Sequence, residues 1–223
     1  MPIIKRKYDI MAMALMVVLC CSGVYLPWYR YHTFILAICV GVVMFVLNRS
    51  WGFLSLSDTG KLFRRPGVWA LICLLVLLNL FAAPITALAM PQYYGFILGY
   101  EPTRTFISYY SNYRPALVIA IVAMDVAWRG YFQTTLLKWF KNRAALAILV
   151  PAAILPVGLV SVGANFNSLP FDTIAWDYAF MLLNSALYGM LFYRTKSLPV
   201  MVFTHITAVV VSYWYGFSAT IIR

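Results

Sequence analysis

The stretch ALVIAIVAMDVAWRGYFQTTLL, residues 116–137, is an apolar segment with two charged residues inside it. Its 22 residues are close to the roughly 20 residues that an α-helix needs to cross a bilayer. Asp125 and Arg129 each cost a few kcal/mol or more at bilayer depth unless they are paired or hydrated. They are four positions apart, so they share one face of a helix and are able to pair. The stretch therefore predicts a membrane-spanning helix with a polar site in it.

Six further apolar segments flank this stretch, and their residues are 10–26, 33–47, 68–90, 144–162, 176–193 and 198–221. The whole chain of 223 residues is 64% hydrophobic and 10% charged, with a mean hydropathy of +0.84. A soluble domain is near half apolar and a quarter charged, so this composition excludes a water-soluble globule. We expect an all-α, polytopic transmembrane helical bundle of about seven spans, with residues 1–223 forming a single integral membrane domain. Prolines 151 and 156 are expected to kink the fifth span.

The positive charges alternate along the chain in a way that predicts topology. Twelve of the 17 Lys and Arg residues lie before the first span or in every second loop: Lys5, Arg6, Lys7, Arg49, Lys61, Arg64, Arg65, Lys138, Lys141, Arg143, Arg194 and Lys196. The opposite loops hold Arg30, Arg104, Arg114 and Arg223. The positive-inside rule then places the N-terminus in the cytoplasm and the C-terminus outside. The net charge of +11 is thus a topology signal, and we expect membrane lipid and no nucleic acid as a partner.

Two loops are long enough to have structure of their own. Residues 48–67 mix aromatic, leucine and basic residues, as an amphipathic segment on the cytoplasmic leaflet or a linker that sets topology would. The predicted outer loop, residues 91–115, is rich in tyrosine, which is typical of an aromatic belt and also compatible with a partner-binding face. The four cysteines all fall inside apolar spans without metal-ligand spacing, so neither a disulfide, a metal site nor another cofactor is expected.

A third ionisable residue, His205, lies in the last span. Counted from the predicted cytoplasmic ends, Arg129 and His205 lie at a similar depth of roughly 10 to 12 Å, and Asp125 lies one turn deeper. The three side chains are therefore predicted to gather in one cavity that opens to the cytoplasm. Alternatively, Asp125 and Arg129 neutralise each other, and His205 bonds to a carbonyl or hydroxyl group.

Two motifs resemble those of a known family. MDVAWRGYFQ, residues 124–133, is similar to the first motif of the CAAX-protease and bacteriocin-processing (CPBP) family, in which two adjacent Glu precede Arg-Gly, here Arg129 and Gly130. ALYGMLFYRTKSLPVMVFTH, residues 186–205, resembles the closing motif, with Gly189, Arg194, Thr195 and the histidine in place. Lys196 replaces the usual glycine. The resemblance covers about residues 115–210 and implies an intramembrane glutamic protease fold.

The departures from this family concern its chemistry. Met124 occupies the position of the Glu that is understood to activate the hydrolytic water, and a thioether cannot accept that proton. The fifth span contains no histidine, since the chain has only His32 and His205. Val209 replaces the Asn or Asp that follows the closing histidine. Losing three members of a catalytic set indicates a pseudoenzyme.

These observations lead to three hypotheses. The first is a noncatalytic family member that binds or scaffolds a peptide or another membrane or envelope protein, in bacteriocin maturation or immunity, as the resemblance implies. The second is an active peptidase whose base is Asp125, with His205 assisting. The third is a substrate or proton path through the same polar layer.

Overall fold

The computed structural model describes residues 3–25, 29–48, 65–81, 118–140, 142–163 and 171–221. Within these ranges every regular element is a helix, which confirms the all-α prediction. The predicted outer loop and most of the predicted cytoplasmic loop, residues 49–64, lie outside the described residues. The amphipathic and tyrosine-rich interpretations of these loops therefore stay predictions.

The helices follow the apolar segments of the sequence closely. They are α1 (Ile3–Tyr25), α2 (Arg30–Leu47), α4 (Pro66–Leu80), the π-helix η2 (Val126–Gln133), α8 (Thr134–Trp139), α9 (Ala144–Gly163), α10 (Phe171–Thr195) and α11 (Leu198–Ile221). Residues 118–125 are also helical and lead directly into η2. The third apolar segment extends to residue 90, whereas α4 ends at Leu80, and residues 82–90 lie outside the described ranges. Both prolines of the fifth segment lie inside α9, and their predicted kink stays a prediction.

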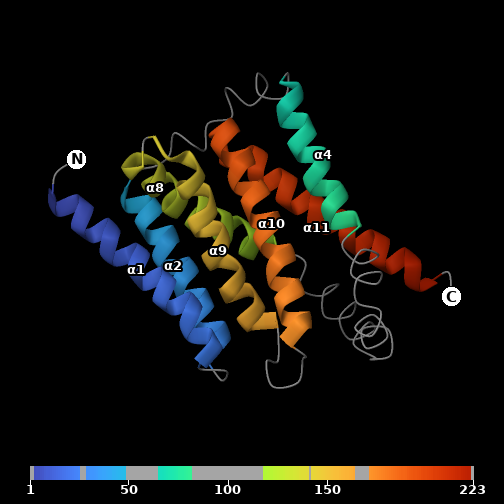
Figure 1. Ribbon diagram of the computed structural model, residues 1–223, viewed down its shortest axis with the longest axis horizontal. Coiled ribbons are helices and arrows are strands. Elements are labelled where there is room, and N and C mark those ends of the chain that lie inside the picture. Colours follow the sequence, from blue (N-terminus) through green and yellow to red (C-terminus); the bar gives the residue numbers. More distant parts are fainter. Residues whose placement is uncertain are drawn as a thin grey trace.

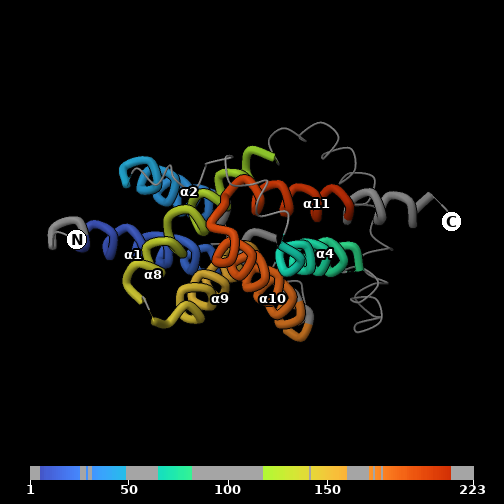
Figure 2. The backbone as a smooth tube through the Cα atoms, turned by 90° about the horizontal axis from the view of Figure 1, so that it is seen from above, coloured from blue at the N-terminus to red at the C-terminus, as the bar shows by residue number. Residues whose placement is uncertain are grey.

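The segment formed by residues 118–139 lies in the middle of the bundle. Its π-helical part contacts α2, α9, α10 and α11. On one side α1 packs against α2 and α9, and on the other α4 packs against α10 and α11. Figure 2, seen from above, shows residues 118–133 between α2 and α11, with α1, α9, α10 and α4 in a row below them and α8 below α1. The chain thus surrounds its two motif segments with helices.

The helix ends that the charge count assigns to the cytoplasm lie on one side of the bundle, the upper side in Figure 1. Near the start of α1, Arg6 lies over the ring of Trp139, which ends α8, at 5.8 Å from the ring centroid. Asn48, which follows α2, donates a hydrogen bond to Asp9 of α1 at 3.0 Å. A common side for these ends agrees with the alternating topology, while their orientation across a membrane remains a prediction.

The bundle has many apolar side chains outside and many polar side chains inside. Exposed large hydrophobic residues of α1 and α2 include Met11, Val18, Ile35, Val43 and Leu47. Buried polar or charged residues are Asp9, Asp125, Arg129, Gln133, Thr134, Thr135, Ser185, Thr195, Ser197 and Thr204. An apolar exterior of this extent would be costly in water and is favourable in lipid.

By length and composition, one helix among the described residues can cross a membrane, namely Arg6–Tyr25. Four shorter apolar helices accompany it: His32–Leu47, Pro66–Leu80, Ala144–Leu159 and Leu198–Val211. The seven-span topology therefore stays a prediction, whereas the helical bundle is confirmed.

The turn between α10 and α11 explains why the closing motif has its particular residues. Lys196 has a φ of 51°, in the left-handed region that favours glycine, and its N–H donates to the Phe192 carbonyl at 2.7 Å. The Thr195 hydroxyl donates to the Leu191 carbonyl at 2.8 Å. Ser197 accepts a hydrogen bond from the Val200 N–H at 3.4 Å and so caps α11. Thr195 and Ser197 therefore cap the helix ends at this turn. A glycine in place of Lys196, as in the family motif, would adopt the left-handed conformation without backbone strain.

We expect Lys196→Gly to stabilise the protein by about 0.5 to 1 kcal/mol, because the left-handed conformation is unfavourable for a residue with a Cβ. The gain is partly offset by losing the contact of the Lys196 ammonium with the Tyr193 ring, whose centroid is 4.1 Å away. Lys196→Ala is the control, since it removes the ammonium and keeps the strain. Thermal unfolding in detergent should rank glycine above wild type and wild type above alanine. Equal stabilities of the two variants would contradict this explanation.

Candidate functional site

The first motif forms a π-helix instead of a continuous α-helix. The i→i+5 pattern runs from Val126 to Gln133, and such segments are rare and frequently occur at functional sites. The Thr134 hydroxyl donates to the Arg129 carbonyl, five residues earlier, at 3.0 Å. Residues 127–133 are all buried. The polar side chains of this motif therefore point into neighbouring helices.

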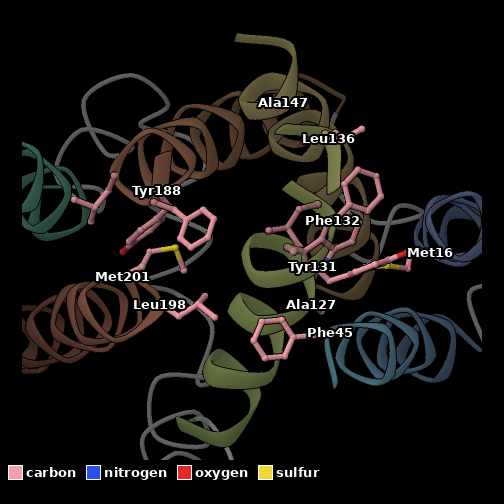
Figure 3. Packing of buried hydrophobic residues seen from close by; sticks show 14 of the residues in the cluster. Met16, Phe45, Ala127, Tyr131, Phe132, Leu136, Ala147, Tyr188, Leu198 and Met201 are labelled. Atoms are coloured by element: carbon pink, nitrogen blue, oxygen red, sulfur yellow. The ribbon is translucent and has the colours of Figure 1, made fainter. Parts of the chain in front are cut away.

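Gly130 allows η2 to approach its neighbours closely. A Cβ at this position would lie 2.8 Å from the Phe45 ring and 3.1 Å from Leu198. Figure 3 shows Phe45 and Leu198 beside the same ribbon that carries Ala127. The Arg-Gly pair of the motif thus places a buried cation, Arg129, next to a residue that must lack a side chain so that the helices can pack closely.

Asp125 and His205 form the closest polar contact between the two motifs. His205 Nδ1 lies 3.2 Å and 3.1 Å from the two carboxylate oxygens of Asp125. The Asp125 side chain is 5% exposed and the His205 side chain is 15% exposed. Of the three side chains that were predicted to gather in one cavity, Asp125 and His205 are thus in direct contact, while the cavity itself stays a prediction. The carboxylate orients the imidazole, and the other ring nitrogen remains for another partner.

Asp125 and Arg129 form no direct salt bridge, although they are close enough to interact electrostatically. The Arg129 Nη2 group donates instead to the carbonyl and the hydroxyl of Ser185, at 2.8 Å and 2.6 Å. The physical reason is that α10 offers two acceptors on one residue at the guanidinium, so Nη2 is satisfied by another helix. Within the part of the chain that the structure describes, Nε and Nη1 of the buried guanidinium have no hydrogen-bond partner.

Three further residues of this site were missed by the sequence reasoning. Gln133 donates to the Gly189 carbonyl at 2.8 Å. The Tyr188 ring lies against the His205 ring, with 4.5 Å between centroids and an angle of 34°. Ser185, Tyr188 and Gly189 are spaced i, i+3 and i+4 on α10, so one helical face carries them all. This polar stripe in an apolar segment was the signal that could have found Ser185 and Tyr188.

Gly189 is the close-approach residue of α10. A Cβ there would lie 3.1 Å from Ile148, 3.4 Å from Gln133 Oε1 and 3.5 Å from Arg129 Nη1. A side chain would therefore crowd the polar groups that join η2 to α10. This explains in physical terms why the closing motif has a glycine at this position.

The remaining motif residues differ in burial: some pack inside the bundle and one is exposed at its surface. Met124 is partly buried and packs against the hydrophobic core. Val209 follows His205 by one turn of α11 and is half-buried. Arg194 is exposed at the end of α10, and Thr195 is buried beside it. Within the described ranges, no group of three His, Cys, Asp or Glu side chains could hold a metal ion.

Residues 106–211 match a protein family described as Rce1-like, type II CAAX prenyl endopeptidase. No curated protein matches this chain, and no solved structure matches it. The matched range includes both motifs, η2 and the contact between Asp125 and His205. Members of this family are membrane proteins.

Proposed function

Because residues 106–211 belong to the Rce1-like family of CAAX-protease-type membrane proteins, we propose that the chain is a noncatalytic member that binds or scaffolds a partner. The partner is a peptide or another membrane or envelope protein, and bacteriocin maturation or immunity is the proposed context. The proposed location is a bacterial inner membrane, with the N-terminus in the cytoplasm and the C-terminus outside. The common side of the cation-bearing helix ends supports this orientation.

The observation that carries the proposal is the environment of Met124. Its side chain packs against the hydrophobic core, at the position where the resembled family has its water-activating Glu. The neighbouring carboxylate of Asp125 faces His205 Nδ1 with both oxygens. Hydrolysis requires a base that is free to take a proton from water. The first motif therefore keeps a polar framework in which the usual base is replaced by a packing residue.

An apolar hollow next to the site supports a hydrophobic partner. Its volume is about 330 Å³, and its lining residues are Val42, Val118, Ile119, Val122, Ala123 and Val126. The hollow lies between α2 and the helix that leads into η2. One of its lining residues, Val126, directly follows Asp125 in the chain. Its lining is aliphatic, as the surface of a hydrophobic peptide or a transmembrane segment would require.

A second function, peptidase activity, is favoured by the contact between Asp125 and His205. A carboxylate that holds one nitrogen of an imidazole fixes the tautomer and lets the other nitrogen act as a base. The 15% exposure of the His205 side chain gives a water or substrate some access to the ring. The sequence predicts Asp125 as the base of this alternative, with His205 assisting. The contact of both Asp125 oxygens with His205 Nδ1 favours the reverse roles, with His205 as the base and Asp125 orienting it.

The two functions predict different results for His205→Ala in complementation of a deletion strain. For a binding protein, activity should follow the amount of protein in the membrane, because the residue only packs and bonds to Asp125. For a peptidase, activity should fall by several orders of magnitude at normal abundance. Asp125→Asn should behave in the same way as His205→Ala in each case.

His32→Ala is the matched control, since His32 is the other histidine of the chain and is exposed on α2. Membrane abundance is measured by immunoblotting and truncated peptides by mass spectrometry. If His205→Ala abolishes function at normal abundance and a truncated peptide disappears with it, while His32→Ala retains both, the noncatalytic proposal is wrong.

A further inference from the structure

A basic hollow lies where the start of α4 meets the end of α10. It has a volume of about 190 Å³ and is lined by Arg65, Gly67, Val68 and Arg194. Arg194 Nη1 would lie 3.4 Å from a Cβ on Gly67, so the guanidinium lies directly against the glycine backbone. Arg194 belongs to the closing motif, but Asp125, Arg129 and His205 of the polar core do not line this hollow. It is a separate feature at the surface of the bundle.

The charge of this hollow is uniformly positive among its described lining residues. Arg65 and Arg194 come from different helices and are both exposed. Lys196 adds a third cation two residues after Arg194, with its ammonium over the Tyr193 ring. Guanidinium groups bind phosphate with a planar, bidentate geometry. An anion with phosphate chemistry is therefore the complement of this hollow.

The surroundings of the hollow are those of a membrane surface. Trp69 is 47% exposed and Tyr193 is 38% exposed, on the two helices whose ends form the hollow. Exposed Trp and Tyr are typical of the boundary between lipid and water. Both helices continue from the hollow into the bundle, so lipid tails could lie along them while a headgroup stays at their ends. A cytoplasmic surface also contains the anionic lipids that attract basic residues.

We propose that Arg65, Gly67 and Arg194 form a binding site for the phosphate of an anionic phospholipid headgroup. The proposal rests on the proposed membrane location of the chain and is independent of whether the protein cleaves or only binds its partner. Two arginines should each contribute about fivefold to lipid affinity, since one net hydrogen bond from each guanidinium to the phosphate contributes about 1 kcal/mol.

The test compares the purified full chain with R65Q/R194Q by native mass spectrometry after exchange into mixed micelles of phosphatidylglycerol and phosphatidylcholine. The wild type should retain phosphatidylglycerol selectively, and the double variant should lose about 30-fold in apparent affinity. K138Q/R143Q is the matched control, because it removes two exposed cations from the same side of the bundle without touching the hollow. The control should retain selectivity.

Three results would overturn the proposal. One is equal loss of phosphatidylglycerol from both double variants, which would mean that only net charge matters. Another is unchanged retention by R65Q/R194Q. The last is complete displacement of the lipid by millimolar inorganic phosphate, which would make the hollow a site for free phosphate. If the double variant does not fold, R194Q alone should lose about fivefold. A binding or cleavage defect at the polar core would leave all these outcomes unchanged, so the two proposals can fail separately.

Discussion

Arg129→Ala is expected to destabilise the protein by about 3 to 5 kcal/mol, from the cavity and the lost hydrogen bonds together. The substitution removes a buried guanidinium and leaves the carbonyl and the hydroxyl of Ser185 without their donor at 2.8 Å and 2.6 Å. It also leaves a cavity between η2 and α10, and it removes the cation nearest in sequence to the buried Asp125 carboxylate. Thermal unfolding in detergent and the amount of membrane-inserted protein measure the effect. The variant should accumulate poorly at the growth temperature.

Ser185→Ala tests whether the Ser185 contact is the important one. It removes the hydroxyl acceptor and keeps the carbonyl, so a loss of about 1 kcal/mol is expected. Combined with Arg129→Ala, the loss should be smaller than the sum of the single losses, because both changes break one contact. Asp125→Ala with Arg129→Ala should be closer to additive, since Asp125 bonds to His205. Strong coupling of Asp125 with Arg129 instead would mean that these two residues form the buried ion pair.

The sequence predicted those parts of the fold that depend on local composition. Apolar segments became helices because hydrophobic periodicity and length are local properties, and α11 runs from Leu198 to Ile221 as the last segment indicated. The meeting of Asp125 with His205 was predictable only in part, because counting residues from the ends of helices placed Arg129 at the depth of His205 and Asp125 one turn deeper. A gathering of the three side chains was expected, but which of them contacts His205 depends on how α11 packs on the helix that precedes η2.

The partner of Arg129 was not predictable in the same way. The i, i+4 rule identifies residues of one helix that share a face, but it cannot show which acceptors another helix brings to that face, and here α10 brings Ser185. The residues VAWRGYFQ also give no local signal that their helix widens to i→i+5. The widened segment fits between Phe45 and Leu198, which belong to two other helices, so tertiary contacts accompany the change. Tyr188 was missed for a related reason, since its ring is important only where α11 brings His205 to within 4.5 Å.

Gly41→Ala is expected to destabilise the protein by about 2 kcal/mol, although alanine is the better helix former. A Cβ on Gly41 would lie 2.5 Å from the Cβ of Ala127, 2.8 Å from its Cα and 2.9 Å from Met16. Ala127 belongs to η2 and its Cα is backbone, so the two helices must separate to admit the new methyl group. Overpacking of this kind costs about 1 to 3 kcal/mol or more, against a gain of about 1 kcal/mol from helix propensity.

The consequence of this substitution extends to the candidate site, because Ala127 follows Asp125 by two residues. Moving η2 away from α2 changes the position of Asp125 relative to α11, which holds His205. Gly67→Ala is the control, since among the described residues a Cβ there meets the Arg194 guanidinium alone, at 3.4 Å, and that side chain can move. In detergent the control should unfold at or above the wild-type temperature, whereas Gly41→Ala should unfold well below it. If both glycines tolerate alanine equally, the close packing of α2 on the π-helix does not determine where Asp125 lies.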